Sequence, residues 1–406
     1  MECSVITLEN GVRIIHRDVQ MPVVYCGMVI DAGSRDEKSD EQGLAHFAEH
    51  MLFKGTQKRR SGHIINRLEN VGGELNAYTS KEETVVYAAV LEEHLDKAVD
   101  LIGDIVFNST FPEKEFEKER IIILDEIQSY NDSPSELIYD DFEEILFHGH
   151  SLGKNILGTP ELLGDYHVDH LKNFVNCNYR PERMVFFVLG KASEAQLKRW
   201  GEKFFQSKSD VQFVESRIKP DMHLPVVKEV QKDTHQVHFM LGNRTFDLYH
   251  PDKTAMFLLN NILGGPGMNS LLNLSLREKN GLVYNVDSVY QPLIDTGMWT
   301  VYFGCDPENF NRCKKLVFNE LRNLREHKLS DVALKKYKMQ LLGQTAIASE
   351  NKENLSISLG KSLLRYGKVE THQYFRERIM EITPEKIREI AAIVFNEESI
   401  SSLKYY

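Results

Sequence analysis

The two halves of the chain repeat one pattern of predicted elements, and this repeat constrains the fold more than any other feature. Residues 67–108 align loosely with residues 276–321. Each segment is typical of a helix end, a glycine turn, two strands and an amphipathic helix, with VYxA or VYFG in the second strand. The pattern therefore predicts a chain of two similar α+β domains.

A polar segment divides the chain near its middle. Residues 207–229 contain two prolines, charges of both signs and little hydrophobic periodicity, which is typical of an interdomain linker. We predict an N-terminal domain over residues 1–207, a linker over residues 208–229 and a C-terminal domain over residues 230–406.

Composition excludes several classes of protein. Lysine and arginine number 49 against 60 aspartate and glutamate, a formal net charge of −11, so the chain lacks the basic excess that attracts nucleic acid. Five scattered cysteines without a CxxC pair fit a reducing compartment. No apolar run approaches the roughly 18 residues of a membrane span, and we see no signal or transit peptide. We expect a cytoplasmic protein with no nucleic-acid or membrane partner.

The stretch HFAEH, residues 46–50, places metal-binding side chains close together. Side chains three and four apart share one face of a helix, so His46, Glu49 and His50 lie together. Two neutral imidazoles on one face can bind a zinc ion, although such a pair taken alone is more often solvated or part of a core. The matching stretch of the second half, residues 254–265, lacks these side chains. Only the N-terminal domain is predicted to hold a metal.

A catalytic zinc needs a third protein ligand and a carboxylate that takes a proton from water. Glu49 is placed for the proton. Glu119 and Glu126 are seven apart on a predicted helix rich in isoleucine, where two buried carboxylates are costly unless a cation compensates them. The alternative for Glu119 is a solvated helix residue. The 75 residues between His50 and Glu126 are too many for local geometry to decide.

Four stretches together resemble the pitrilysin family of zinc peptidases, the inverzincins. They are HFAEH, NVGGELNAYTSKEETVVY (70–87), ERIIILDEIQ (119–128) and LREKNGLVY (276–284). The resemblance covers nearly the whole chain. The length of the chain is most similar to that of the smaller, two-domain members, which include the β-subunit of mitochondrial processing peptidase and bacterial processing-type peptidases.

The resemblance implies two homologous domains, each a mostly antiparallel sheet packed with helices. It makes His46, His50 and Glu126 the ligands of one Zn2+ per chain and Glu49 the general base. It makes Glu119 an acid that supports the site without binding the metal. The implied function is a zinc-dependent endopeptidase that cleaves unfolded peptides or small polypeptides in a chamber between the domains. Zinc-activated water would attack the peptide carbonyl, and Glu49 would pass its proton to the leaving amine.

Further residues match family positions that contact substrate. Arg277 and Tyr284 match positions that face the zinc, where arginine can hold a carbonyl or carboxylate and tyrosine can stabilise an oxyanion. A structural ion pair and a core tyrosine are the simpler alternatives. Asn76 and Ala77 match a strand edge beside the zinc, to which an extended peptide could add as a strand.

The resemblance is compatible with more than one assembly and with a non-catalytic role. Two domains form half of the chamber that four-domain relatives build in one chain, so we expect a homodimer. A heterodimer whose zinc-bearing half is this chain remains possible. The chain could also be a non-catalytic subunit of the same fold, like the core proteins of the respiratory cytochrome bc complex, although its intact His46, Glu49, His50 and Glu126 speak against this.

Overall fold

The computed structural model describes residues 3–206 and 217–406, and these form two compact units. The first unit comprises the described parts of Met1–Gln128, Lys154–Arg217 and Ala348–Glu370. The second comprises Ser129–Gly153, Ile218–Ile347 and Thr371–Tyr406. Residues 208–216 of the predicted linker lie outside the described residues, and residues 217–226 carry no regular secondary structure.

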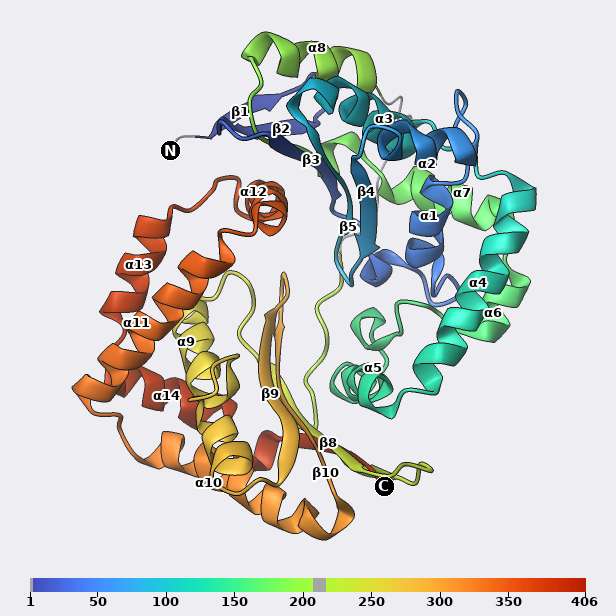
Figure 1. Ribbon diagram of the computed structural model, residues 1–406. Helices are drawn as coiled ribbons and strands as arrows, with labels where there is room; N and C mark the ends of the chain where they lie inside the picture. The colour runs from blue at the N-terminus through green and yellow to red at the C-terminus, as the bar shows by residue number, and fades with distance from the viewer. Residues whose placement is uncertain (1–2, 207–216) are drawn as a thin grey trace. The chain divides into compact units, whose positions relative to one another are not determined.

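The first unit contains a six-stranded sheet with the order β1-β2-β6-β3-β5-β4 (Figure 1). Neighbouring strands are antiparallel except β2 and β6, which are parallel. The continuous apolar run of β6 is buried at every residue, because this strand lies inside the sheet and both of its faces are covered. The strands are β1 Ser4–Thr7, β2 Arg13–Arg17, β3 Val23–Ile30, β4 Glu74–Thr79, β5 Thr84–Leu91 and β6 Met184–Leu189.

The second unit contains a five-stranded sheet with the order β7-β11-β8-β10-β9. When β7 to β11 are matched in turn with β2 to β6, the strand order is the same, and the one parallel pair is the same pair. The predicted α+β class, with two similar and mostly antiparallel sheets, is confirmed. The strands are β7 Val227–Val230, β8 Val237–Thr245, β9 Val283–Pro292, β10 Gly297–Cys305 and β11 Ser401–Tyr405.

Helices cover both sheets. Those that lie wholly or mostly in the first unit are α1 Leu44–Leu52, α2 Ser61–Glu69, α3 Leu95–Phe107, α4 Glu113–Asn131, α6 Pro160–Asp165, α7 Val168–Asn178, α8 Glu194–Phe204 and α12 Lys352–Tyr366. Those of the second unit are α5 Pro134–Leu146, α9 Lys253–Gly264, α10 Phe310–Glu326, α11 Asp331–Ala348, α13 His372–Glu381 and α14 Pro384–Val394.

Each sheet takes one of its covering helices from the other half of the chain. Helix α12 packs Leu359 and Leu363 against the apolar face of the first sheet that includes Val29 and Phe187. A Cβ atom on Gly360 would lie 2.7 Å from a methyl carbon of Val29, so the helix and the sheet leave no room for a larger side chain here.

Helix α5 covers the second sheet in the same way. It packs Ile138 and Phe142 in one buried cluster with Met240 and Leu403. The predicted boundaries at residues 207 and 230 divide the sequence and not the packed units. In the packed units, α5 belongs with the second sheet and α12 with the first. An apolar sheet face must be covered by some element, and burial does not depend on where that element lies in the chain.

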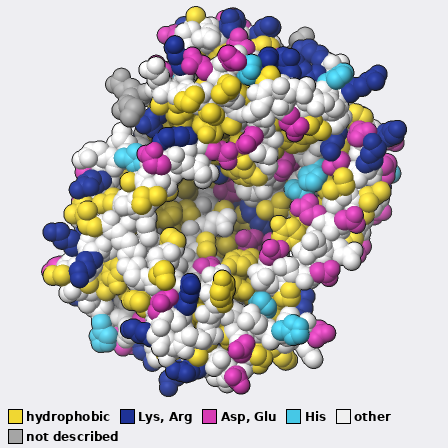
Figure 2. All heavy atoms as spheres, in the orientation of Figure 1, with side chains coloured by type: hydrophobic (Ala, Val, Ile, Leu, Met, Phe, Trp, Pro, Cys, Tyr) yellow, Lys and Arg dark blue, Asp and Glu magenta, His cyan; other side chains and the backbone are white. Residues whose placement is uncertain are grey.

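The described surface mixes side chains of all kinds. Acidic and basic side chains are interspersed with apolar ones on the face that Figure 2 shows. Among the described helices, none is long and apolar enough to cross a membrane.

Ion pairs attach α12 and the end of the linker segment to the first sheet. Asp31, which follows β3, lies 2.6 Å from Arg365 of α12 and 2.9 Å from Arg217. Arg183 is 3.8 Å from the same carboxylate. Burial alone would raise the pKa of Asp31, but the guanidinium groups of Arg217, Arg365 and Arg183 outweigh it and hold the pKa below its usual value.

Replacing this carboxylate should destabilise the chain in a pH-dependent way. A lowered pKa in the folded state contributes stability above the unfolded pKa, and the contribution is lost as the pH falls through the folded value. We expect Asp31→Asn to lower the free energy of unfolding by about 2 kcal/mol at pH 7, with the difference from wild type shrinking below about pH 4. Urea unfolding between pH 3 and 7 measures this, with the exposed Asp169→Asn as control. A constant difference across the range would contradict it.

Candidate metal centre

The HFAEH stretch lies on α1, which is almost completely buried. The carboxylate of Glu37 caps the start of this helix, since it accepts hydrogen bonds from the backbone N–H groups of Gly43, at 3.1 Å, and Ala45, at 2.7 Å. Gly43 has a φ of 92°, and a Cβ there would lie 2.7 Å from the carbonyl oxygen of Leu157. Only glycine fits this entry to the helix, so α1 is set firmly into the core.

His46 and His50 of α1 converge with Glu126 of α4. The Nε2 atoms of His46 and His50 lie 3.9 Å and 3.8 Å from Glu126 Oε2, and one ligand atom from each residue lies within 4.8 Å of the other two. Tetrahedral zinc ligands are separated by roughly 3.3–3.5 Å, given metal–ligand bonds of about 2.0–2.2 Å. Within the described residues, this is the one group of three or more metal-ligating side chains close enough to hold an ion.

The chemistry of this donor set fits zinc. His46 is 8% exposed, and burial, together with the neighbouring His50, lowers the pKa of His46 to about 3. The ring is therefore neutral at pH 7, which is the form that binds a metal. Its other nitrogen, Nδ1, is buried and has no hydrogen-bond partner among the described residues. Two imidazoles and one carboxylate form a set of catalytic zinc ligands.

Glu49 lies on the same face of α1 and is held from β4. Thr79, the last residue of β4, donates a hydrogen bond of 2.6 Å from its hydroxyl to Glu49 Oε2. Burial raises the pKa of Glu49, although this hydrogen bond and His50 oppose the shift. Thr79 is not among the predicted site residues, although it lies in the NAYTS stretch that carries the family resemblance.

Glu119 is buried beside His50 and lies about two helical turns before Glu126 on α4. His50 Nδ1 donates to Glu119 Oε2 at 3.1 Å, and the ammonium group of Lys54 lies 2.7 Å from the other oxygen, Oε1. The stacked rings of Phe47 and Phe116, 4.4 Å apart, pack α1 against α4 beside this group. Lys54 is not among the predicted site residues, although a buried acid on α4 is itself a reason to expect a cation beside it.

Asn76 and Ala77 lie on β4, the edge strand of the first sheet. They pair with Tyr87 and Val86 of β5, and no other described strand pairs with β4. Because Thr79 ends the same strand, the edge leads directly to Glu49. The structure thus brings the predicted peptide-binding edge and the metal ligands together in one unit.

Arg277 and Tyr284 lie together in the second unit. Arg277 is on a short π-helical segment, Asn273–Glu278, and its guanidinium carbon is 5.9 Å from the ring centroid of Tyr284 on β9. Tyr284 is 88% exposed, so the alternative of a core tyrosine is wrong. Their place relative to the metal ligands stays a prediction.

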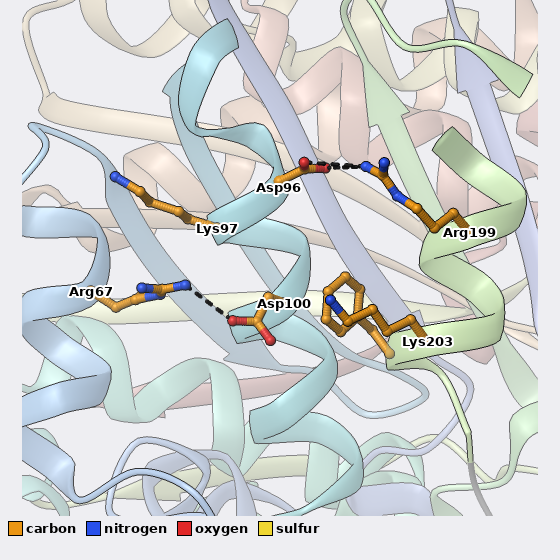
Figure 3. Close-up of a pocket in the computed structure, with 7 residues that line it drawn as sticks. Arg67, Asp96, Lys97, Asp100, Arg199 and Lys203 are labelled. Carbon is orange, nitrogen blue, oxygen red and sulfur yellow. Dashed lines mark hydrogen bonds and ion pairs between the residues drawn. The ribbon is translucent and has the colours of Figure 1, made fainter. Parts of the chain in front are cut away.

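A cavity elsewhere in the first unit does not compete with this group as a catalytic site. It lies between α3 and α8 and is lined by charged side chains (Figure 3). Arg67 pairs with Asp100 at 3.2 Å, and Arg199 pairs with Asp96 at 3.1 Å. In each pair the two charges neutralise each other. No group of three metal-ligating side chains among the described residues lies at this cavity.

Two α+β units of the same strand order, one of which carries an HxxEH stretch on a buried helix, are the features expected of an inverzincin. Residues 13–160 match the family model described as Insulinase (Peptidase family M16), and residues 166–341 match the one described as Peptidase M16 inactive domain. The chain belongs to peptidase family M16, so the resemblance found in the sequence is confirmed.

The relatives extend over almost the whole chain. The uncharacterized zinc protease YmxG of Bacillus subtilis is 33% identical over 393 residues, which cover 97% of this chain and 95% of the relative. An uncharacterized zinc protease of Rickettsia bellii is 31% identical over 403 residues, which cover 98% and 97%.

Solved structures show the same fold. A protease from Helicobacter pylori has a TM-score of 0.92 at 21% identity and covers 100% of this chain and 99% of its own. A Pseudomonas fluorescens structure, described as a peptidase M16 inactive domain, has a TM-score of 0.92 at 19% identity and covers 100% and 98%. The predicted two-domain fold is confirmed by these likenesses.

Proposed function

We propose that this chain is a zinc-dependent endopeptidase. The observation that carries the proposal is the convergence of His46, His50 and Glu126 beside the carboxylate of Glu49. Three protein ligands and one free carboxylate are what a catalytic, rather than a structural, zinc site requires. The names of the relatives, which are called zinc proteases, support the same metal and reaction.

In this proposal the three ligands would hold one Zn2+, which supplies Lewis acidity and makes water a nucleophile at neutral pH. Glu49 accepts the proton of the attacking water and returns it to the leaving amine. Thr79 occupies Oε2 of Glu49, which leaves Oε1 for the water.

The proposed substrates are unfolded peptides or small polypeptides. An extended peptide can add to the edge of β4 and use its main-chain groups for affinity, so that side-chain selectivity stays loose. A folded protein offers few unpaired extended segments, and it should be a poor substrate. We assign Arg277 and Tyr284 to contacts with the substrate carbonyl, because a guanidinium and an exposed phenol can both stabilise developing negative charge.

Glu49→Gln should remove the base and keep the metal. We expect both wild type and variant to hold about one zinc per chain, while cleavage of unfolded fluorogenic peptides falls by about 10²- to 10⁴-fold in the variant. Zinc content by atomic absorption and initial rates measure the two effects. Glu69→Gln, an exposed glutamate of α2, serves as a matched control and should cleave at the wild-type rate. If wild type holds zinc and cleaves no peptide, the chain acts as a binding subunit or needs an unlike partner.

Thr79→Val should lower kcat and leave KM unchanged. The valine keeps the shape of the side chain and removes the hydroxyl that holds Glu49, so we expect kcat to fall by roughly tenfold through misplacement of the base. Thr79→Ser keeps the hydroxyl and should restore most of the rate. A variant whose KM rises at constant kcat would instead place the role of Thr79 in peptide binding at the β4 edge.

We propose that the active form is a homodimer. Two-domain chains contain half of the domains of the four-domain peptidases that they resemble, and a second copy is the simplest source of the other half. Sedimentation of the purified chain alone should give twice the chain mass together with peptidase activity. Activity in a monomer, or a requirement for a second gene product, would contradict this.

A further inference from the structure

We propose that Lys54 is a positioning residue of the metal centre. Its ammonium group holds the carboxylate of Glu119 in the orientation that receives the Nδ1–H of His50, and this aims Nε2 of His50 at the metal. The inference rests on the proposed function, because it concerns the same zinc site.

Two polar contacts connect Lys54 to His50 through the carboxylate of Glu119. Lys54 Nζ lies 2.7 Å from Glu119 Oε1, and Glu119 Oε2 accepts from His50 Nδ1 at 3.1 Å. The opposite nitrogen of the same ring, Nε2, lies 3.8 Å from Glu126 Oε2. Because the imidazole is rigid, fixing its Nδ1 side fixes the direction of its Nε2 side.

Burial makes the lysine necessary for this arrangement. Glu119 is 4% exposed, and it lies on α4 between the fully buried Phe116 and Ile123. A buried carboxylate whose single partner is an imidazole N–H lacks the full compensation that a cation provides. In the described part of the chain, Lys54 is the one lysine or arginine within ion-pair distance of Glu119. Without it, the carboxylate loses the contact that orients it.

The backbone around Lys54 is fixed on both sides. Its N–H donates to the carbonyl of Met51 in the last turn of α1, at 3.2 Å. The next residue, Gly55, accepts a hydrogen bond from the N–H of Thr110 at 3.1 Å, and Thr56 forms a β-bridge with Ser109. The side chain of Lys54 thus projects from a rigid turn between the end of α1 and the segment that leads to α4. A positioning group needs such a fixed backbone.

A second lysine, Lys118, serves as a control, because it forms an ordinary ion pair on the surface of the same helix that carries Glu119. Lys118 of α4 pairs with Glu115 at the same 2.7 Å distance, but its side chain is 55% exposed, against 23% for Lys54. Exposed pairs of this kind contribute little. Replacing each lysine by methionine removes one ammonium group and keeps the length of the side chain.

The test is zinc affinity measured on the full chain by competition with a chromophoric chelator. We expect Lys54→Met to weaken zinc binding by about tenfold, the lower end of the range for outer-shell partners of metal ligands. Lys54→Arg should restore most of the affinity, and Lys118→Met should match wild type. The visible spectrum of the cobalt-substituted protein should change in Lys54→Met alone among these variants, since it reports the ligand geometry directly.

A double-mutant cycle decides whether Lys54 acts through Glu119. In a Glu119→Gln background, Lys54→Met should cause no further loss of affinity. Wild-type affinity in Lys54→Met, or an equal loss in both backgrounds, would overturn the inference. If Lys54→Met fails to fold, Lys54→Gln, which keeps a donor, should bind zinc with intermediate affinity, and wild-type affinity there would overturn it as well. Absence of zinc binding in wild type would instead reject the proposed function.

Discussion

The fold depends on the requirement that both apolar faces of each sheet be covered. In the first unit, one face packs on α1 and α3, and the other face packs on α12. In the second unit, one face packs on α9, α10 and α14, and the other packs on α5. Because α5 and α12 each come from the other half of the chain, neither half can bury its own sheet completely.

The same constraint positions the chemistry. Helix α1 lies under the first sheet because its apolar residues complete the core, and the polar residues of HFAEH are carried into a largely dry environment with it. There His46 stays neutral, while Glu119 needs partners in His50 and Lys54. The metal centre is therefore a consequence of burying a helix whose one polar face is turned toward α4 and β4.

The two units show how one topology can be used with and without a metal. Helix α1 lies between β3 and β4 in the chain, and α9 lies at the equivalent place between β8 and β9. On α9 the polar side chain of Asn260 exchanges hydrogen bonds with Ser288 of β9 and so fastens the helix to its own sheet. The description of residues 166–341 as an inactive domain agrees with this difference.

The sequence by itself determined the elements whose signals are local. The repeat predicts two similar α+β units, and the spacing of His46, Glu49 and His50 places them on one helical face, because a helix of about 3.6 residues per turn leaves no alternative. Only the tertiary structure decided that Glu126, separated from His50 by 75 residues, reaches the same point. It also decided that Thr79 holds the carboxylate of Glu49, that Lys54 holds that of Glu119, and that α5 and α12 are exchanged. These contacts join segments far apart in the chain. They form because covering an apolar face lowers the free energy, whatever the position of the covering element in the sequence.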